Sequence, residues 1–206
     1  MAKRNVPLPP LKQRENILPN LVTSKYFTQH TMSSRIGDII IRPAVQKELW
    51  ETEHMWRHLA ETGDGFGIDE FTEDGIFNRK LFHESSVFVA VTPGEKIVAG
   101  GLFGPSTLSR ERDKVATCYI GTKSSHRRLG IGSQMLDMFV GLAQKHNFEG
   151  LMVDVLLTNL QFMKRMKNLG FVICGSLPFC AYVKHHGPTD SLLCFKDFRN
   201  RLKSAL

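Results

Sequence analysis

The residues best suited to chemistry lie in one short stretch, SSHRRLGIGSQMLD, at residues 124–137. Gly130 and Gly132 carry no side chain, so successive backbone N–H groups there can converge on an anion. An apolar helical pattern begins between them, and the start of a helix adds unbonded N–H groups and partial positive charge. Arg127 and Arg128 bring full charges to the same place. The stretch therefore predicts a phosphate-binding turn, for which a pyrophosphate is the natural occupant.

Two other phosphate-binding motifs do not fit this stretch. A Walker loop ends in Gly-Lys-Ser/Thr, and a Rossmann fingerprint has a third glycine where Met135 stands here. The spacing that remains is Arg-x-x-Gly-x-Gly, which is weak on its own. A glycine-rich turn between a strand and a helix, with no ligand, is the alternative interpretation.

A carboxylate stands inside an apolar run further along the chain. Asp154 lies in GLMVDVLL, residues 150–157, where a charge is costly unless it is paired or faces a cleft. One interpretation is that Asp154 holds an amine or relays its proton. The other is that Asp154 pairs with an arginine or a backbone N–H for structural reasons. The sequence leaves both open.

The remaining titratable residues are weaker candidates for a substrate site. Glu53 suits a solvated helix face, and packing explains most tyrosines without invoking a substrate. His185 and His186 adjoin Gly187 and indicate a hairpin turn, so no metal site is predicted. The residues that could line a substrate site are Glu53, His54, Glu70, Glu73, Tyr119 and Tyr182.

Hydrophobic periodicity predicts the elements that position these residues. Glycine ends two of the expected helices, at Gly63 and Gly170, and Asn159 is a good N-cap for the second of these. The expected helices are 45–62, 69–82, 131–145 and 159–169, and the expected strands are 39–41, 87–91, 96–103, 114–122, 150–157, 172–183 and 192–198.

This order of seven strands and four helices predicts an α+β class, a mixed sheet with helices packed on it. Residues 1–35 are polar and basic, with Glu15 as their single acid, and we expect them to form a flexible N-terminal arm. Residues 36–206 then form a single domain.

Composition narrows the classes of partner. The 206 residues are 42% hydrophobic and 23% charged, an ordinary globular balance. A formal net charge of +7 permits anionic ligands, but no aromatic–basic platform accompanies it, so no nucleic-acid partner is expected. No apolar run reaches about 18 residues, so no membrane partner is expected.

Cysteine spacing and the N-terminus bear on the compartment. Four cysteines lie far apart without a CxxC pair, which favours free thiols in a reducing, cytoplasmic setting. The basic N-terminal arm allows a mitochondrial presequence as the minority alternative. Pro7, Pro9 and Pro10 interrupt an early amphipathic helix there.

The chain resembles the GNAT superfamily of N-acetyltransferases in two spaced motifs and in the order of its elements. Arg127, Gly130 and Gly132 match the family's Arg/Gln-x-x-Gly-x-Gly/Ala turn, which binds the pyrophosphate of acetyl-CoA. Asn159, followed by a helix that ends in Leu-Gly-Phe at 169–171, matches the second signature. The resemblance implies a GNAT-like acyl-CoA N-acyltransferase fold. That fold has a seven-stranded, mostly antiparallel sheet with a splayed central parallel pair, flanked by four helices.

The resemblance also implies a site for acetyl-CoA, used as a cosubstrate without a metal. The pantetheine arm would lie between the splayed strands. A backbone N–H near Ile120 would polarise the thioester carbonyl, and Asp154 would border the acceptor site. Many relatives place a tyrosine proton donor where this chain has Met166, which cannot donate. The implied cofactor-binding residues are Ile120, Gly121, Thr122, Arg127, Arg128, Leu129, Gly130, Ile131, Gly132, Ser133, Asn159, Phe162 and Met166.

The activity that the resemblance implies is direct transfer of an acetyl group to an amine in a ternary complex. A small molecule is the preferred acceptor. The tail at 175–198 resembles, more loosely, the fungal azetidine-carboxylate (proline-analogue) acetyltransferases, which act on small amino acids or related compounds. A protein lysine or N-terminal acetyltransferase and a non-catalytic CoA-binding domain are the alternatives. The oligomeric state stays open, with a homodimer as one option.

Overall fold

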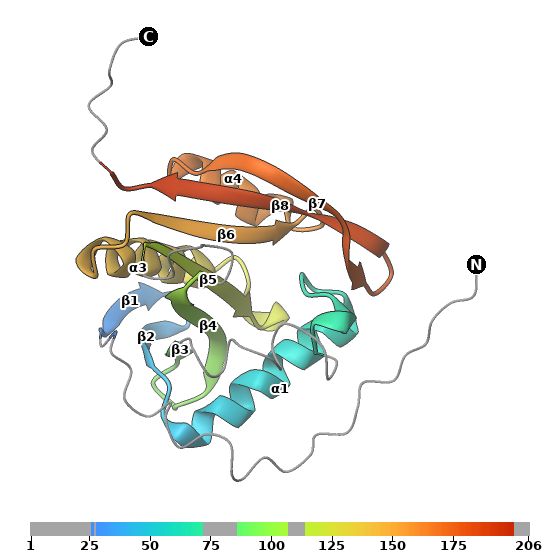
Figure 1. Cartoon of the computed structure of the whole chain (residues 1–206). Helices are drawn as coiled ribbons and strands as arrows, with labels where there is room; N and C mark the ends of the chain where they lie inside the picture. The colour runs from blue at the N-terminus through green and yellow to red at the C-terminus, as the bar shows by residue number, and fades with distance from the viewer. Residues whose placement is uncertain (1–25, 27, 72–85, 107–113, 200–206) are drawn as a thin grey trace.

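A computed structural model describes residues 26, 28–71, 86–106 and 114–199. These residues form one eight-stranded sheet in the order β1-β2-β3-β4-β5-β6-β8-β7, with helices packed on it (Figure 1). The strands are β1 His30–Ser34, β2 Gly37–Pro43, β3 Ser86–Val91, β4 Ile97–Pro105, β5 Val115–Thr122, β6 Gly150–Leu156, β7 Val172–Val183 and β8 Gly187–Asp197. The helices are α1 Gln46–Thr62, α3 Ile131–Lys145 and α4 Leu160–Asn168, with short 3-10 helices η1 Ile68–Phe71 and η3 Ser124–His126.

The sheet is antiparallel at every pairing except one. Strands β5 and β6 are parallel neighbours, and they join an antiparallel half, β1 to β5, to a second antiparallel half, β6-β8-β7. The mixed α+β sheet with a central parallel pair is therefore confirmed. The sheet has eight strands, so the expected count of seven was wrong by one.

The additional strand is β1, which lies in the stretch expected to be part of the arm. Met32 is its one buried hydrophobic side chain, and it faces Ile39 of β2 across the hairpin. Gly37 closes that hairpin with a φ of 100°. A single buried methionine among polar residues gives no alternation that a pattern could detect, which is why the strand was missed. Tyr26 is also buried, so the packed part of the chain begins before residue 36.

The other expected elements can be compared directly. Residues 68–71 form η1, and the rest of the helix expected over 69–82 lies outside the described residues. The last strand begins at Gly187 rather than at residue 192. Strand β7 continues past Pro178, with an irregular register beside Phe179, whose φ is 51°.

Alternating side chains of β3 supply hydrophobic cores on both faces of the sheet. Phe88 and Ala90 pack with α3, including Phe139, whereas Val87 and Val89 pack on the opposite side with α1. Figure 1 shows α1 running alongside β3 and β4. Within the described part of the chain, no helix is both long enough and apolar enough to span a membrane.

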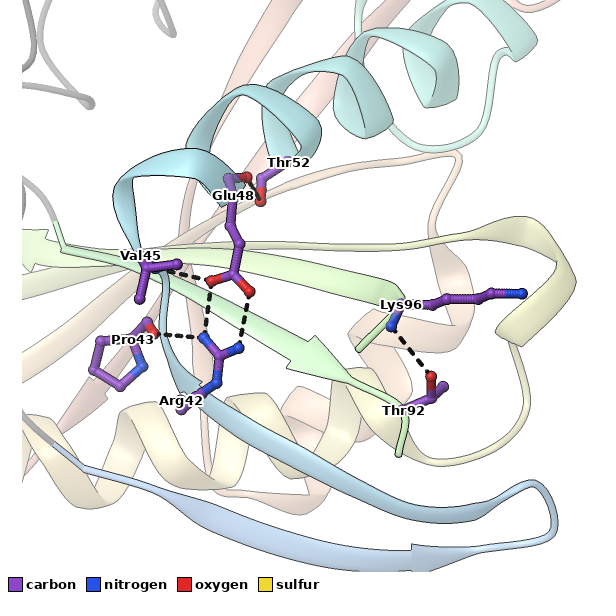
Figure 2. Close-up of polar contacts among 7 residues, drawn as sticks. All are labelled: Arg42, Pro43, Val45, Glu48, Thr52, Thr92 and Lys96. Carbon is purple, nitrogen blue, oxygen red and sulfur yellow. Dashed lines mark hydrogen bonds and ion pairs between the residues drawn. The ribbon is translucent and has the colours of Figure 1, made fainter. Parts of the chain in front are cut away.

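The start of α1 is fixed by an ion pair rather than by an N-cap side chain. Val45, the N-cap residue, has no oxygen with which to cap, and the carboxylate of Glu48 accepts its backbone N–H at 2.8 Å instead. Figure 2 shows that the same carboxylate accepts two hydrogen bonds of 2.8 Å from the guanidinium of Arg42. Burial opposes ionisation of Glu48, but these bonds outweigh it and the pKa of Glu48 is lowered. The pair therefore links β2 to α1.

Replacing Glu48 with glutamine should lower the free energy of unfolding by about 1–3 kcal/mol, because it leaves the Arg42 guanidinium without its charged partner. The lowered pKa means that Glu48 stabilises the fold above its ordinary pKa of 4.5 and loses this effect as the pH falls below it. Urea unfolding at pH 7 and pH 4 measures both effects. Glu61→Gln, in an exposed position of the same helix, is the control and should change stability by less than about 0.5 kcal/mol. Equal losses in the two variants would contradict this role of Glu48.

Candidate active site

The parallel strands β5 and β6 separate partway along their length. They pair at only three positions, from Val115↔Gly150 to Thr117↔Met152. Strand β5 stays paired with β4 as far as Thr122, and β6 stays paired with β8 as far as Leu156. Each strand thus remains in its own half of the sheet while the two diverge (Figure 1). The expected splay is present, and it leaves facing strand edges without strand partners.

A cavity of about 360 Å³ lies where the strands separate. One wall comes from residues 118–120 of β5 and residues 153–156 of β6. Asn159 and Phe162, at the start of α4, extend this wall. The structure thus brings Ile120, Asp154, Asn159 and Phe162, four of the residues that the sequence singled out, to one cavity.

Asn159 has a structural duty as well as a place in the cavity wall. Its side-chain oxygen accepts the backbone N–H of Phe162 at 3.4 Å, as an N-cap does.

Met166, two turns further along α4, is 1% exposed and packs in the hydrophobic core. It is not among the residues that line the cavity, and its expected contact with the cofactor stays a prediction. Met166 is the one buried residue of α4, which packs this face of the helix onto the sheet.

The glycine turn lies between β5 and α3, at the end of the splayed strand. Gly130 is the N-cap of α3 and has a φ of 81°, a left-handed conformation that favours glycine. The first turn of α3 has no side-chain cap and no acidic residue. Its N–H groups at residues 131–133 are therefore suited to an anion.

Gly132 is not required by the fold itself. Its φ is not positive. A Cβ atom there would make only ordinary contacts, at 3.4 Å from Thr122 Oγ1 and 3.8 Å from Ile120 Cγ2. Neither backbone strain nor packing within the protein explains a glycine at this position. Close approach of a ligand to the helix start would explain it.

Arg127 is joined to the loop that follows α1. Its guanidinium donates to Asp64 Oδ1 at 2.9 Å and to the Asp64 backbone oxygen at 3.0 Å, and the Ser124 hydroxyl donates to Asp64 Oδ2. Burial opposes ionisation of Asp64, but these bonds lower its pKa overall. In the part of the chain that the structure describes, Arg128 forms no ion pair. Arg128, rather than Arg127, thus has a charge free for an anion at the turn.

The cavity lining is also acidic. Asp69 and Glu70, in η1, line it together with Asp154. A Cβ on Gly67 would lie 2.9 Å from that of Ala181, so this glycine allows η1 to lie directly against β7. Asp69 Oδ1 accepts the backbone N–H of Tyr182 at 3.0 Å and fastens the two elements together. This packing places Glu70 in the cavity wall.

Burial shifts both of the remaining carboxylates. It raises the pKa of Glu70 to about 8, with Asp154 and Asp69 adding to the effect, although the N–H of Gly67, 2.6 Å from Glu70 Oε1, opposes it. Burial likewise raises the pKa of Asp154 to about 6. Asp154 Oδ1 is buried and has no hydrogen-bond partner among the described residues. The structural interpretation of Asp154, a pair with an arginine or a backbone N–H, therefore has no support from this oxygen.

Of the other residues that the sequence singled out, some line the cavity and some do not. Glu53 pairs with Arg57 at 3.5 Å, and His54 is an exposed residue whose ring lies against that of Trp50. Neither side chain lines the cavity, and Glu73 lies outside the described residues. Tyr119 is in the wall, whereas Tyr182 contributes only the backbone N–H described above.

The sequence reasoning gave Glu70 little weight, although it lies in the cavity wall. The helical pattern over 69–82 was weak, and nothing local ties Glu70 to Asp154. The one signal that could have identified it was Gly67, three residues before it, which allows the close packing described above.

Comparisons with known proteins agree with this geometry. The sequence model of the acetyltransferase (GNAT) family matches residues 42–171. No curated protein sequence matches the chain. Solved structures do match, and at identities of 14–23% their likeness shows the fold.

Three of the solved structures illustrate the range of similar proteins. A GNAT superfamily phosphinothricin acetyltransferase from Sinorhizobium meliloti, in complex with AcCoA, is 16% identical with a TM-score of 0.64, over 81% of this chain and 89% of its own. An acetyltransferase of the GNAT family from Streptococcus pneumoniae is 23% identical with a TM-score of 0.60, over 77% and 99%. A ribosomal-protein-alanine N-acetyltransferase from Brucella melitensis is 21% identical with a TM-score of 0.61, over 76% and 98%.

Proposed function

Because the chain belongs to the GNAT family of acetyltransferases, we propose that it transfers the acetyl group of acetyl-CoA to the amine of a small molecule. The observation that carries this proposal is the cavity at the split between β5 and β6, which is lined by strand edges and by carboxylates. A thioester held along the strand edges would lie in the same cavity as an amine held by the carboxylates.

The cofactor site that we propose follows the splayed strand from end to end. The N–H groups of residues 131–133 and the charge of Arg128 would hold the pyrophosphate. The unpaired edge of β5 near Ile120 would hold the pantetheine arm as if it were an added strand, beside Asn159. The Sinorhizobium meliloti structure, which contains AcCoA, supports this choice of cosubstrate.

Bound acetyl-CoA supplies an activated thioester, and the residues of this chain handle the amine. An amine that binds as an ammonium must lose two protons to become an amide. The Glu70 carboxylate accepts the first, which frees the nitrogen lone pair, since its pKa of about 8 suits a base working near neutral pH. The nitrogen would then form a bond to the carbonyl carbon while the carbon–sulfur bond breaks, and its second proton would reach the CoA thiolate through water, because Met166 lies in the core. Asp154 holds the acceptor, and a backbone N–H near Ile120 polarises the carbonyl.

Acetyl-CoA binding and acetylation, measured separately, test this proposal. Isothermal titration with CoA should show binding, and mass spectrometry should detect acetylated products in a panel of small amines and of lysine and N-terminal peptides. Acetylation of peptides alone would favour a protein acceptor. Tight CoA binding without any acetylated product would leave a non-catalytic CoA-binding domain and refute the enzyme.

A further inference from the structure

The titratable carboxyl groups in the cavity lining are acidic, whereas the chain as a whole is basic. Three carboxylates line the cavity, and no lysine, arginine or histidine does so among the described residues. The chain as a whole carries a formal net charge of +7. A basic exterior favours the approach of an anionic cofactor, whereas this interior favours a cation.

Two of the three carboxylates are free to bind a ligand. Asp69 accepts the N–H of Tyr182, which commits it to holding η1 against β7. Glu70 has one oxygen bonded to the Gly67 N–H, and the bonds described for it leave the other oxygen available. Asp154 Oδ1 has no partner in the described part of the chain, although it is shielded from solvent. A desolvated carboxylate of this kind is costly without a partner, and a ligand would supply one.

Resting on the proposed function, we propose that the acceptor is a small dication: a primary amine that carries a second positively charged group. Asp154 binds the second charge, while Glu70 faces the amine that is acetylated. The acceptor would thus satisfy both of the carboxylates that the fold leaves without a cationic partner.

Charge balance explains why the second positive group matters for catalysis as well as for binding. A single ammonium balances one of the two carboxylates, and the other then keeps its proton in a desolvated cavity. If the protonated group is Glu70, it cannot accept a proton from the amine. A second positive charge allows both groups to ionise together and leaves Glu70 ready to act as a base.

The same charge disfavours acceptors that carry a carboxylate. An amino acid would place its own negative charge beside Glu70 and Asp154, with no basic side chain in the described lining to balance it. The looser likeness of the C-terminal tail to azetidine-carboxylate acetyltransferases implied an amino-acid acceptor. The cavity favours a different class.

Matched amines test this inference. Diamines of three to six carbons are each compared with the monoamine and the ω-amino acid of the same length, by kcat/KM for acetylation. The best diamine should exceed its monoamine by about tenfold or more, as expected for one additional charge contact, and the amino acid should be poorer still. Asp154→Asn should reduce the diamine preference to within about threefold.

The control variant is Asp38→Asn, which changes an aspartate of β2 that bonds Ser33 and lies outside the cavity wall. It should keep the wild-type preference. A monoamine or amino acid that is used as well as its diamine would overturn the inference and leave the N-acetyltransferase intact. Absence of acetylation with every amine and peptide would instead refute the proposed function. The comparison of matched amines with the wild-type enzyme tests the inference even if Asp154→Asn fails to fold.

Discussion

Replacing Glu70 with glutamine should lower kcat about 100-fold or more and leave CoA affinity unchanged. Glutamine keeps the size of the side chain but cannot accept the proton of the amine. The wild-type enzyme should also gain activity as the pH rises through about 8, because Glu70 is protonated below its pKa and acts as a base above it. Steady-state kinetics from pH 6 to 9.5 measure both effects.

The two kinetic constants should respond to pH differently. The profile of kcat/KM reports the free enzyme, so its rising limb should lie near pH 8, whereas the profile of kcat reports the complex. A dicationic acceptor beside Glu70 should lower the pKa of Glu70 in the complex, so the rising limb of the kcat profile should lie at a lower pH than that of kcat/KM. Glu61→Gln, exposed on α1, is the control, and both of its profiles should rise at the same pH as those of the wild type. If Glu70→Gln kept kcat within threefold of the wild-type value, and its kcat/KM still rose at the same pH, the role of base would pass to Asp154.

Replacing Gly132 with alanine should weaken CoA binding at least about tenfold without destabilising the protein. The additional methyl group meets only ordinary contacts within the protein, so the loss would come from its position on the surface that the pyrophosphate approaches. Displacing a charge-assisted hydrogen bond typically costs about 1.5–3 kcal/mol, which corresponds to at least tenfold in affinity. Isothermal titration with CoA measures the affinity.

The same helix offers a matched control for this substitution. A Cβ on Gly141, about two and a half turns further along α3, would meet no atom within 4 Å. Both alanine variants should raise the free energy of unfolding by up to about 1 kcal/mol, because alanine is the better helix former. Only Gly132→Ala should lose affinity. Equal CoA affinity in the two variants would contradict the assignment of the glycine turn to the pyrophosphate.

The elements of the proposed site's cofactor half could be predicted from the sequence because their determinants are local. Gly130 stands at the N-cap of a helix, and Asn159 caps another. Each of these features needs only its immediate neighbours along the chain. The periodicity of the longer helices and of the hairpin β3–β4 was likewise sufficient to place them.

The acceptor half could not be predicted because its determinants join distant parts of the chain. Glu70 enters the cavity wall because Asp69 fastens η1 to Tyr182 of β7. Arg127 is ion-paired with Asp64, in the loop that follows α1. No spacing in the sequence reveals either contact. The burial of Met166 likewise depends on how α4 packs on the sheet.

The three residue pairs that join β5 to β6 have a consequence for the lifetime of the folded chain. They are the whole of the backbone ladder between two halves of the sheet, so this seam is the natural place for the fold to open. A ligand that lies along the seam binds only the folded form and stabilises it, by about 2.7 kcal/mol at a concentration of 100 times its dissociation constant. Degradation acts on opened chains, so coenzyme A bound along the seam as proposed would protect the protein from degradation.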